Sequence, residues 1–337
     1  MPARISTFPS PTKVQEDAWA AWRSFALAAA FELDLFSHID AGKLAAPELA
    51  SAIGADAHAV ERLCDAMVAL KYLRKRGHQY HLTPVAKTYF VRGGELYMEG
   101  LESFVAGTVV SGWLQLSQVI KSGKPLEPVE PAARAEFFRK LVKTIFPLSY
   151  VPAQSAVAAL SQAARARIRS ILDVGAGSAA WSLAFARALP QARVSAVDLP
   201  QVLEITRQYT ERYHVSDRYE CIGGDFRELD FGKQRYDLII LGQILHGEQR
   251  QAARALVEKS SLALREKGMI LIAEFIARDR RDGPPAALLF GLNMLLNTQQ
   301  GDVYTMRDYR EWLKAAGMKT VKTILAPLAS PLILASK

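Results

Sequence analysis

The chain has 337 residues, of which half are apolar and 23% are charged, so its composition excludes a disordered or fibrous protein. This length exceeds the size at which one hydrophobic core keeps growing, and we expect two domains. The formal net charge of +8 comes from basic residues scattered along the chain, which argues against a nucleic-acid partner.

The two cysteines, Cys64 and Cys221, lie far apart without a second cysteine or a histidine at ligand spacing. This spacing predicts no disulfide and no metal site, and it fits a reducing cytosol. Residues 1–13 lack the apolar core of a signal peptide, and two acidic residues interrupt the apolar run at 25–36. We therefore expect a cytoplasmic protein without a membrane span.

The first expected element is an amphipathic helix at residues 15–31, in which Trp19, Trp22, Ala26 and Ala29 recur at helical spacing. An apolar stripe of this kind needs a partner surface. We expect a homodimer that forms through it.

Short helices and a hairpin follow, with helices expected at 47–53 and 57–70, strands at 72–75 and 79–82, and another helix from Thr83-Pro84. Gly54 suits a left-handed C-cap of the first of these helices, and Asp56 can cap the second. Helix, turn, helix and hairpin predict a winged-helix domain over residues 1–92.

A winged helix also admits a different function, that of a ligand-responsive transcription regulator. The wing carries a basic cluster of Lys71, Arg74, Lys75 and Arg76. The expected recognition helix at 57–70 carries one basic residue against two acidic ones, which is unsuited to a phosphate backbone. The regulator is therefore the less favoured alternative.

Residues 93–166 have a helical pattern with scattered aromatic residues and predict a helical connector. From Arg169 onward, short apolar runs alternate with helical stretches, which is typical of a parallel sheet built from βαβ units. The expected strands are Ser170–Val174, Arg193–Val197, Tyr219–Ile222, Asp237–Leu241, Met269–Phe275, Lys319–Leu325 and Leu332–Ala335. Seven strands predict one doubly wound α/β domain over residues 167–337.

The clearest chemical signal is a glycine turn directly after the first strand of this domain. Asp173 is followed by Gly175 and Gly177, and a turn of this type lets a ligand approach the backbone closely. Asp198 follows 23 residues after Gly175, at the end of the second strand, where a carboxylate can accept hydrogen bonds from both hydroxyls of a ribose. Together these residues predict an adenosine-ligand site.

Two other interpretations of the glycine turn remain open. The glycines alone could make a tight connection between strand and helix. The turn could also bind a dinucleotide such as NAD. The glycine motif of such a site has a third glycine, which would fall near Ala180, and alanine is a permitted variant there. A third signal, Asp225-Phe226 after the next strand, can meet an adenine amino group and ring, although alone it could be a turn cap and a core residue.

Taken together, the motifs Asp-Val-Gly-Ala-Gly, Val197-Asp198-Leu199-Pro200, Gly224-Asp225-Phe226 and Ile244-Leu245-His246 occur in the order found in one family. The chain resembles the S-adenosylmethionine-dependent O-methyltransferases that carry an N-terminal winged-helix dimerisation domain, in bacterial small-molecule and plant caffeate-type enzymes. The resemblance implies a Rossmann-like class I methyltransferase domain with a seven-stranded sheet, an S-adenosylmethionine cofactor and a dimer. It implies a small-molecule acceptor and no metal.

The resemblance also implies a role for each matching residue. It assigns the cofactor to Asp173, Gly175, Gly177, Asp198, Leu199, Asp225, Phe226, Gly242 and Gln243. His246 is then the general base and Glu274 the carboxylate that orients it, whereas a lone histidine at a strand end would otherwise be interpreted as a core residue. The acceptor would be lined by Phe146, Tyr150, Phe290, Met294 and Asn297, which could equally be helix-packing residues.

Three positions depart from the family pattern. Gly247-Glu248 stands where Asp-Trp is typical, Ser178-Ala179-Ala180 stands where a third glycine is usual, and Met306 occupies the place of a second glutamate. Methylation of carbon or nitrogen, or another reaction on the same fold, therefore remains an alternative to methylation of a hydroxyl.

Overall fold

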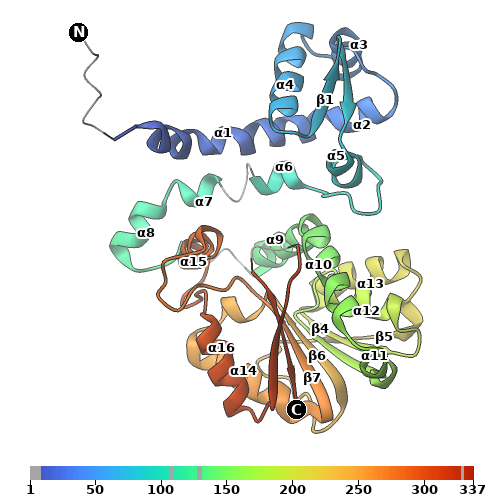
Figure 1. Cartoon of the computed structure of the whole chain (residues 1–337), viewed down its shortest axis with the longest axis vertical. Helices are drawn as coiled ribbons and strands as arrows, with labels where there is room; N and C mark the ends of the chain where they lie inside the picture. The colour runs from blue at the N-terminus through green and yellow to red at the C-terminus, as the bar shows by residue number, and fades with distance from the viewer. Residues whose placement is uncertain (1–8, 106–109, 127–130, 328–329) are drawn as a thin grey trace, which may run out of the picture. The chain divides into compact units, whose positions relative to one another are not determined.

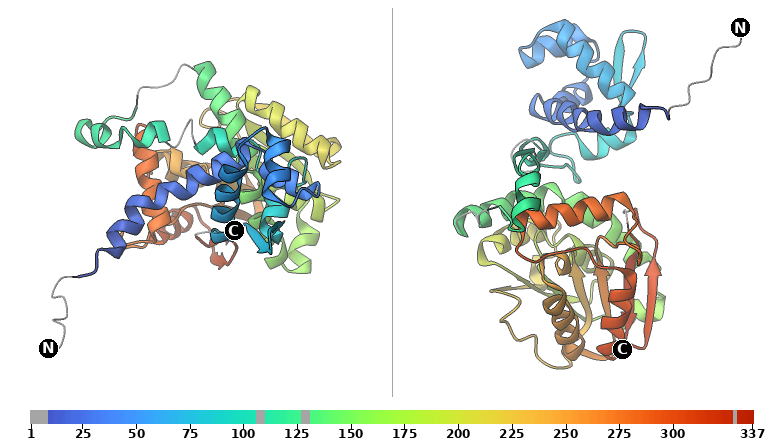
Figure 2. Two further views of the ribbon diagram at one scale, coloured as in Figure 1. Left: turned by 90° about the horizontal axis from the view of Figure 1, so that it is seen from above. Right: turned by 90° about the vertical axis from the view of Figure 1, so that its left-hand side faces the viewer.

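The structure is a computed structural model that describes residues 9–105, 110–126, 131–327 and 330–337, with the side chains of 131–135 left aside. The chain divides into two compact units, Met1–Ser111 and Gly112–Lys337, each of which is described by itself (Figures 1 and 2). No helix among the described residues is long and apolar enough to cross a membrane.

The N-terminal unit contains the expected helices and hairpin. Its elements are α1 (Thr12–Glu32), α2 (Leu35–Asp40), α3 (Ala46–Ile53), α4 (Ala57–Ala69), β1 (Leu73–Arg76), β2 (Gln79–Leu82), α5 (Pro84–Tyr89) and α6 (Leu101–Ser103). The predicted caps are confirmed, because Gly54 adopts a φ of +75° and the Asp56 side chain accepts from the backbone N–H of Ala59. Helix α2 was not predicted, since Asp34, at a φ of +50°, separates it from α1 by a turn without proline or glycine.

An aromatic cluster forms part of the core of this unit. Phe31 at the end of α1 contacts Phe36 and Phe90 edge-on, with ring centroids 5.8 and 5.0 Å apart. The first half of α1 is exposed within this unit, and its residues Trp19 and Trp22 are 46% and 60% exposed. The unit therefore buries only one end of its first helix.

The predicted helical connector consists of several separate helices. They are α7 (Ser111–Trp113), α8 (Leu116–Ser122), α9 (Pro131–Thr144), α10 (Phe146–Ala159) and α11 (Gln162–Arg167). The boundary between the two compact units falls inside this segment, at Ser111. The division into parts at 1–92, 93–166 and 167–337 stays a prediction.

The C-terminal unit is built on a seven-stranded sheet in the order β5-β4-β3-β6-β7-β9-β8. The strands are β3 (Ser170–Val174), β4 (Arg193–Asp198), β5 (Tyr219–Gly223), β6 (Tyr236–Gly242), β7 (Leu264–Ala273), β8 (Thr320–Ile324) and β9 (Leu332–Ser336). The seven predicted strands are confirmed, and the predicted parallel pattern holds for all of them except the last, β9. Strand β9 runs antiparallel to both β7 and β8. The seven residues between Ile324 and Leu332 are too few for the crossover connection that a parallel pair of β8 and β9 would need.

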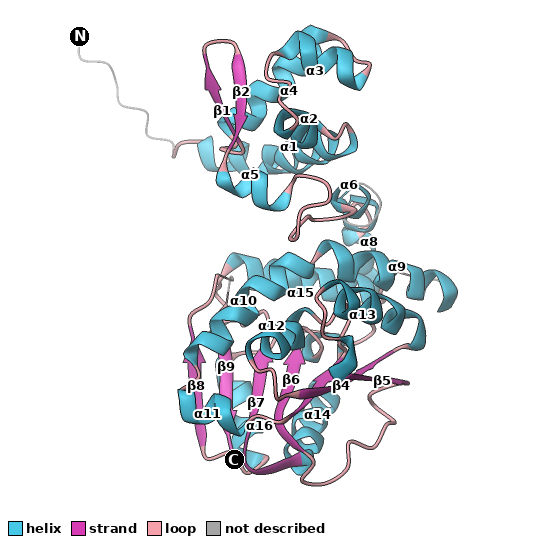
Figure 3. Ribbon diagram, turned by 90° about the vertical axis from the view of Figure 1, so that its right-hand side faces the viewer, coloured by secondary structure: helices cyan, strands magenta, loops and turns pink. Residues whose placement is uncertain are grey.

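Helices cover both faces of this sheet (Figure 3). Helices α10, α12 (Ala180–Ala188) and α13 (Pro200–Arg212) cover one face, and α14 (Arg250–Ala263) and α16 (Met306–Ala315) cover the other. Alternate residues of the buried strands face the two layers, so Leu172 and Val174 pack with α14 and α16 while Asp173 turns toward α12. This arrangement leaves the carboxyl ends of β3, β4 and β6 at one edge, where ligands bind in open α/β sheets.

Asp237 ties the opposite, amino-terminal edges of β3 and β6 together. Its Oδ2 accepts from the backbone N–H groups of Arg169 and Ser170, at 2.8 and 2.9 Å, and from the Ser170 hydroxyl, and Arg265 pairs with Oδ1 at 3.2 Å. Partial burial alone would raise the pKa of Asp237, but these hydrogen bonds outweigh it and hold the pKa below its ordinary value.

Replacement of Asp237 should therefore destabilise the fold. Asp237→Ala leaves two backbone N–H groups unpaired and should lower the free energy of unfolding by about 2–3 kcal/mol at neutral pH, measured by urea denaturation. The stabilisation is present above the ordinary carboxyl pKa and is lost as pH falls through the lowered value, so wild type and variant should converge in acid. Replacement of the exposed Glu266 by alanine is the control. An equal loss of unfolding free energy in both variants would contradict the stabilising role of the Asp237 hydrogen bonds.

Candidate functional site

The glycine turn between β3 and α12 has the backbone that its sequence predicts. Gly175 and Gly177 adopt φ values of +69° and +57°, which favour glycine. A Cβ added at Gly175 would lie 2.8 Å from Cδ1 of Ile244, so the turn and the loop after β6 approach too closely for a side chain. The N–H groups of Gly175 and Ala176 both donate to the carbonyl of Val197, which joins the turn to the end of β4.

Asp198 lies at the same edge, as predicted. Its Oδ2 accepts from the N–H of Gly177 at 2.8 Å, and its Oδ1 accepts from the N–H of Leu199 at 2.7 Å. Burial raises the pKa of Asp198, and these two bonds oppose that rise. Thr206 on α13, which sequence reasoning missed, donates its hydroxyl to the carbonyl of Gly177 at 2.7 Å. The glycine turn is thus held from both sides.

Asp173 is buried directly before the turn, and its Oδ2 has no hydrogen-bond partner. Burial raises the pKa of this carboxyl to about 7, against the effect of hydrogen bonds from Ser182. The Tyr219 hydroxyl and the Ser182 hydroxyl lie 3.1 Å apart in the same buried network. An unpartnered buried oxygen of this kind is a place where a donor from a ligand or a water would fit.

Asp225 and Phe226 follow β5 at the same end of the sheet. The Asp225 carboxylate is held by Arg227, and the Lys259 ammonium donates to the carbonyl of Phe226 at 2.9 Å. The side-chain hydrogen bond from Arg227 lowers the pKa of Asp225 below its ordinary value. Sequence reasoning singled out neither Arg227 nor Lys259, because both look like ordinary surface charges.

Gly242 is the last residue of β6, and Gln243 follows it. Gly242 lies close to the indole of Trp181, a residue that the sequence motifs did not include. A Cβ at Gly242 would lie 2.4 Å from Cδ1 of Trp181 on α12, so glycine is needed there for packing. Gln243 has a φ of +56°, and its N–H donates to the carbonyl of Ala273 at 2.8 Å. This strained residue turns the chain from β6 toward His246.

His246 and Glu274 are brought together by two neighbouring strands. His246 lies in a short 3₁₀ turn, η3 (Leu245–Gly247), after β6, and Glu274 follows β7. His246 Nδ1 and Glu274 Oε2 are 2.6 Å apart, and Oε1 accepts from the N–H of Leu245 at 2.8 Å. The Glu274 side chain is fully buried and that of His246 is 15% exposed. A carboxylate that holds Nδ1 leaves Nε2 as the free acceptor of the imidazole.

Of the residues expected to line the acceptor, Phe290 on α15 (Pro285–Asn297) lies beside His246. Its ring meets the imidazole edge-on, with centroids 4.8 Å apart, and stacks on Phe275 at 4.0 Å. Met294, one turn later, is buried, whereas Asn297 is exposed and donates to the carbonyl of Asn293.

Phe146 and Tyr150 on α10 take a different position. They stack on each other at 5.1 Å, are almost fully buried, and pack against aromatic residues of α13. The Tyr150 hydroxyl accepts from Arg187 at 2.6 Å. These contacts favour the packing interpretation for this pair over a role in the acceptor site.

Met306 does not provide a second carboxylate to His246. It begins α16 and packs against the apolar core, while Thr305 caps the helix with Asp308. Asp308 pairs with Arg250 at 2.6 Å instead of with the histidine. Glu274 is thus the acid that contacts His246 among the described residues.

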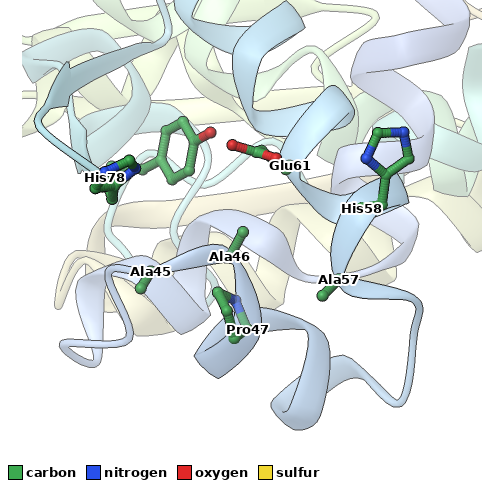
Figure 4. A pocket seen from close by; sticks show the side chains of 8 residues that line it. Ala45, Ala46, Pro47, Ala57, His58, Glu61 and His78 are labelled. Atoms are coloured by element: carbon green, nitrogen blue, oxygen red, sulfur yellow. The ribbon is translucent and has the colours of Figure 1, made fainter.

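A surface pocket of about 470 Å³ lies in the N-terminal unit (Figure 4). It is lined by Ala45, Ala46, Pro47, Ala57, His58, Glu61, His78 and Tyr80, and none of the candidate site residues is among them. Two of its polar groups have partners, because Lys75 pairs with Glu61 and the Tyr80 hydroxyl donates to Asp65.

Comparisons with known proteins agree with this geometry. The family described as the O-methyltransferase domain matches residues 134–319, and the O-methyltransferase dimerisation domain matches residues 18–92. The 3-hydroxy-5-methyl-1-naphthoate 3-O-methyltransferase of Streptomyces sahachiroi is 30% identical, over 93% of this chain and 91% of its own. The tetracenomycin polyketide synthesis 8-O-methyl transferase of Streptomyces glaucescens is 26% identical, over 93% of both chains.

Solved structures share the same fold over the full length. Human N-acetylserotonin methyltransferase, solved in complex with S-adenosylmethionine, superposes with a TM-score of 0.82 at 23% identity, over 100% of this chain and 99% of that one. A structure from Nostoc punctiforme assigned to the O-methyltransferases superposes with a TM-score of 0.83 at 27% identity, over 98% of this chain and 100% of that one. Together with the matches to both domains, these findings show that the chain belongs to the O-methyltransferase family.

Proposed function

We propose that this protein transfers the methyl group of S-adenosylmethionine to a hydroxyl of a small aromatic acceptor, with His246 as general base. The observation that carries the proposal is the contact of 2.6 Å between His246 Nδ1 and the buried Glu274 carboxylate, at the end of the sheet where the glycine turn lies. A histidine held by a carboxylate through Nδ1 is arranged to take a proton at Nε2.

The chemistry suits this pair. A phenol has a pKa near ~10 and an imidazole near ~6.5, so proton removal needs a base placed against the acceptor oxygen. Buried Glu274 stabilises the imidazolium that forms, and it fixes the ring orientation through its contact with Nδ1. The ring of Phe290, which stacks on Phe275, keeps water away from one side of the imidazole and so strengthens this electrostatic interaction.

The cofactor supplies a methyl group on a positively charged sulfur. Asp198 retains lone pairs for a ribose after its two backbone hydrogen bonds, and the unpartnered oxygen of Asp173 can accept from an ammonium or a water. The glycine turn, Leu199, Gly242 and Gln243 surround the same edge of the sheet, with Asp225 and Phe226 at the adenine end. These residues fit the cofactor chemically.

The choice of acceptor class rests on the site and on the relatives. Phe290 lies beside His246 and stacks on Phe275, and an aromatic surface of this kind favours a flat, weakly polar molecule. The bacterial relatives are named for a naphthoate and a tetracenomycin polyketide.

An acceptor screen tests the function. The protein is incubated with S-adenosylmethionine labelled in the methyl group and with hydroxylated aromatic compounds, and products are located by mass spectrometry. Label on a phenolic oxygen is the expected result, and calorimetry should show binding of S-adenosylhomocysteine but not of NAD. Label on carbon or nitrogen alone would refute the assignment to oxygen, and NAD binding would favour an oxidoreductase.

The N-terminal helix supports the proposal of a homodimer. Trp19 and Trp22 stack at 4.8 Å on α1 and stay largely exposed within one chain, and residues 18–92 match the family's dimerisation domain. Replacement of both tryptophans by glutamate should shift the protein from dimer to monomer in light scattering at micromolar concentration, because charge opposes burial of this surface. Gln15→Glu adds a charge to the same helix without removing an apolar side chain and should leave the dimer intact. A monomeric wild type would contradict the proposal.

A further inference from the structure

The loop after β5 contains an arginine that the cofactor roles above do not explain. Arg227 Nε donates to Asp225 Oδ1 at 2.9 Å and to Oδ2 at 3.1 Å, and Nη2 lies 2.9 Å from Oδ2. The backbone N–H of Arg227 also donates to Oδ1 at 2.9 Å. Three N–H groups of one residue thus hold the Asp225 carboxylate.

The Asp225 carboxylate can still accept a hydrogen bond from a ligand in this arrangement. An ionised carboxylate offers about four lone-pair sites, whereas Arg227 supplies three N–H donors, of which Nε is shared between Oδ1 and Oδ2. The Asp225 side chain is 32% exposed, so the remaining site can be reached by a ligand. A carboxylate clamped in this way cannot turn to suit a differently placed donor.

Arg227 itself is anchored from several directions. Its Nη1 lies 3.9 Å from Oε1 of Glu248, and the Glu248 side chain is only 13% exposed. Its guanidinium lies 5.7 Å from the centre of the Phe226 ring. Lys259 donates to the carbonyls of Phe226 and Arg227, at 2.9 and 3.3 Å. The arginine therefore connects the loop after β5 to the loop that carries His246.

We propose that Arg227 determines the base specificity of the cofactor site, by fixing Asp225 as an acceptor with one site left for the 6-amino group of adenine. The inference rests on the proposed placement of adenine at Asp225. A 6-oxo base presents an acceptor at that position and is repelled by the carboxylate, whereas adenine donates. The hydrogen bond from Arg227 also lowers the pKa of Asp225, which stabilises the carboxylate in its acceptor form.

Calorimetry with two ligands tests this role in the full-length protein. The probes are S-adenosylhomocysteine and its 6-oxo analogue, S-inosylhomocysteine. Wild type should prefer the adenine compound by at least about tenfold, because the 6-oxo compound loses a charge-assisted hydrogen bond. Arg227→Ala frees the carboxylate to rotate and should weaken binding of the adenine compound about three- to tenfold, with a clear fall in the preference.

Two further variants make the test specific. Arg227→Lys keeps the charge but not the side-on geometry, so it should recover only part of the preference. Arg254→Ala removes an equally exposed arginine, which pairs with Glu258 on α14, and should bind both ligands as wild type does. Arg227 is 57% exposed, so its replacement should leave the fold intact.

The outcomes separate this inference from the function on which it rests. Full wild-type preference in Arg227→Ala would overturn the role of Arg227. Asp225→Asn should accept the 6-oxo compound, since an amide can donate as well as accept. If Asp225→Asn changes neither affinity while Asp198→Ala weakens both, adenine lies elsewhere, and this inference fails while the methyltransferase function stands. Absence of S-adenosylhomocysteine binding by wild type would refute the proposed function itself.

Discussion

His246→Ala should lower turnover by about 10²–10⁴-fold at neutral pH while leaving the affinity for S-adenosylhomocysteine nearly unchanged. Among the described residues the imidazole contacts Glu274 and Phe290, so its loss should remove the proposed base and leave the proposed cofactor residues in place. Steady-state rates with the acceptor from the screen, together with calorimetry, measure the two effects separately.

The pH dependence of this defect distinguishes a base from a positioning group. A phenol ionises by itself as pH approaches its pKa, so a variant that lacks only a base should recover in alkaline solution. Glu274→Gln should have a smaller defect, because it keeps an acceptor for Nδ1 and loses the charge that stabilises the imidazolium. A wild-type rate for His246→Ala near neutral pH would show that placement alone drives the transfer.

Asp198→Ala is expected to weaken cofactor binding by about 1.5–3 kcal/mol, which is roughly 10- to 150-fold. The variant loses the proposed acceptor of the ribose hydroxyls and releases the N–H groups of Gly177 and Leu199, so Gly177 also loses one of its two hydrogen bonds to side chains. Calorimetry with S-adenosylhomocysteine measures the loss.

A matched variant separates the two contributions to that loss. Thr206→Val removes the other side-chain hydrogen bond to Gly177, which the threonine hydroxyl donates to the Gly177 carbonyl, but it removes no proposed ribose acceptor. It should weaken binding much less than Asp198→Ala does. Equal losses in both variants would mean that Asp198 acts through the turn, and unchanged affinity in Asp198→Ala would place the ribose elsewhere.

Local signals in the sequence were sufficient for most elements. The alternation of short apolar runs and helical stretches predicted all seven strands of the large sheet, and cap residues such as Asp56 predicted where helices begin. These signals work because strand burial and helix capping depend on residues close in the chain. The start of β7 was misplaced by five residues, since its first residues include Arg265, Glu266 and Lys267, which interrupt the apolar run.

The sequence by itself determined the glycine turn, the carboxylate of Asp198 and the order of the motifs, because each depends on residue type at a fixed spacing after a strand. Only the tertiary structure decided which side chains meet. It buried Tyr150 among helices and joined Arg227 to Asp225 and toward Glu248, whereas the contact between His246 and Glu274 was already implied by the family resemblance. The physical reason is that side-chain contacts between elements depend on sheet order and helix packing, which residue spacing along the chain does not specify.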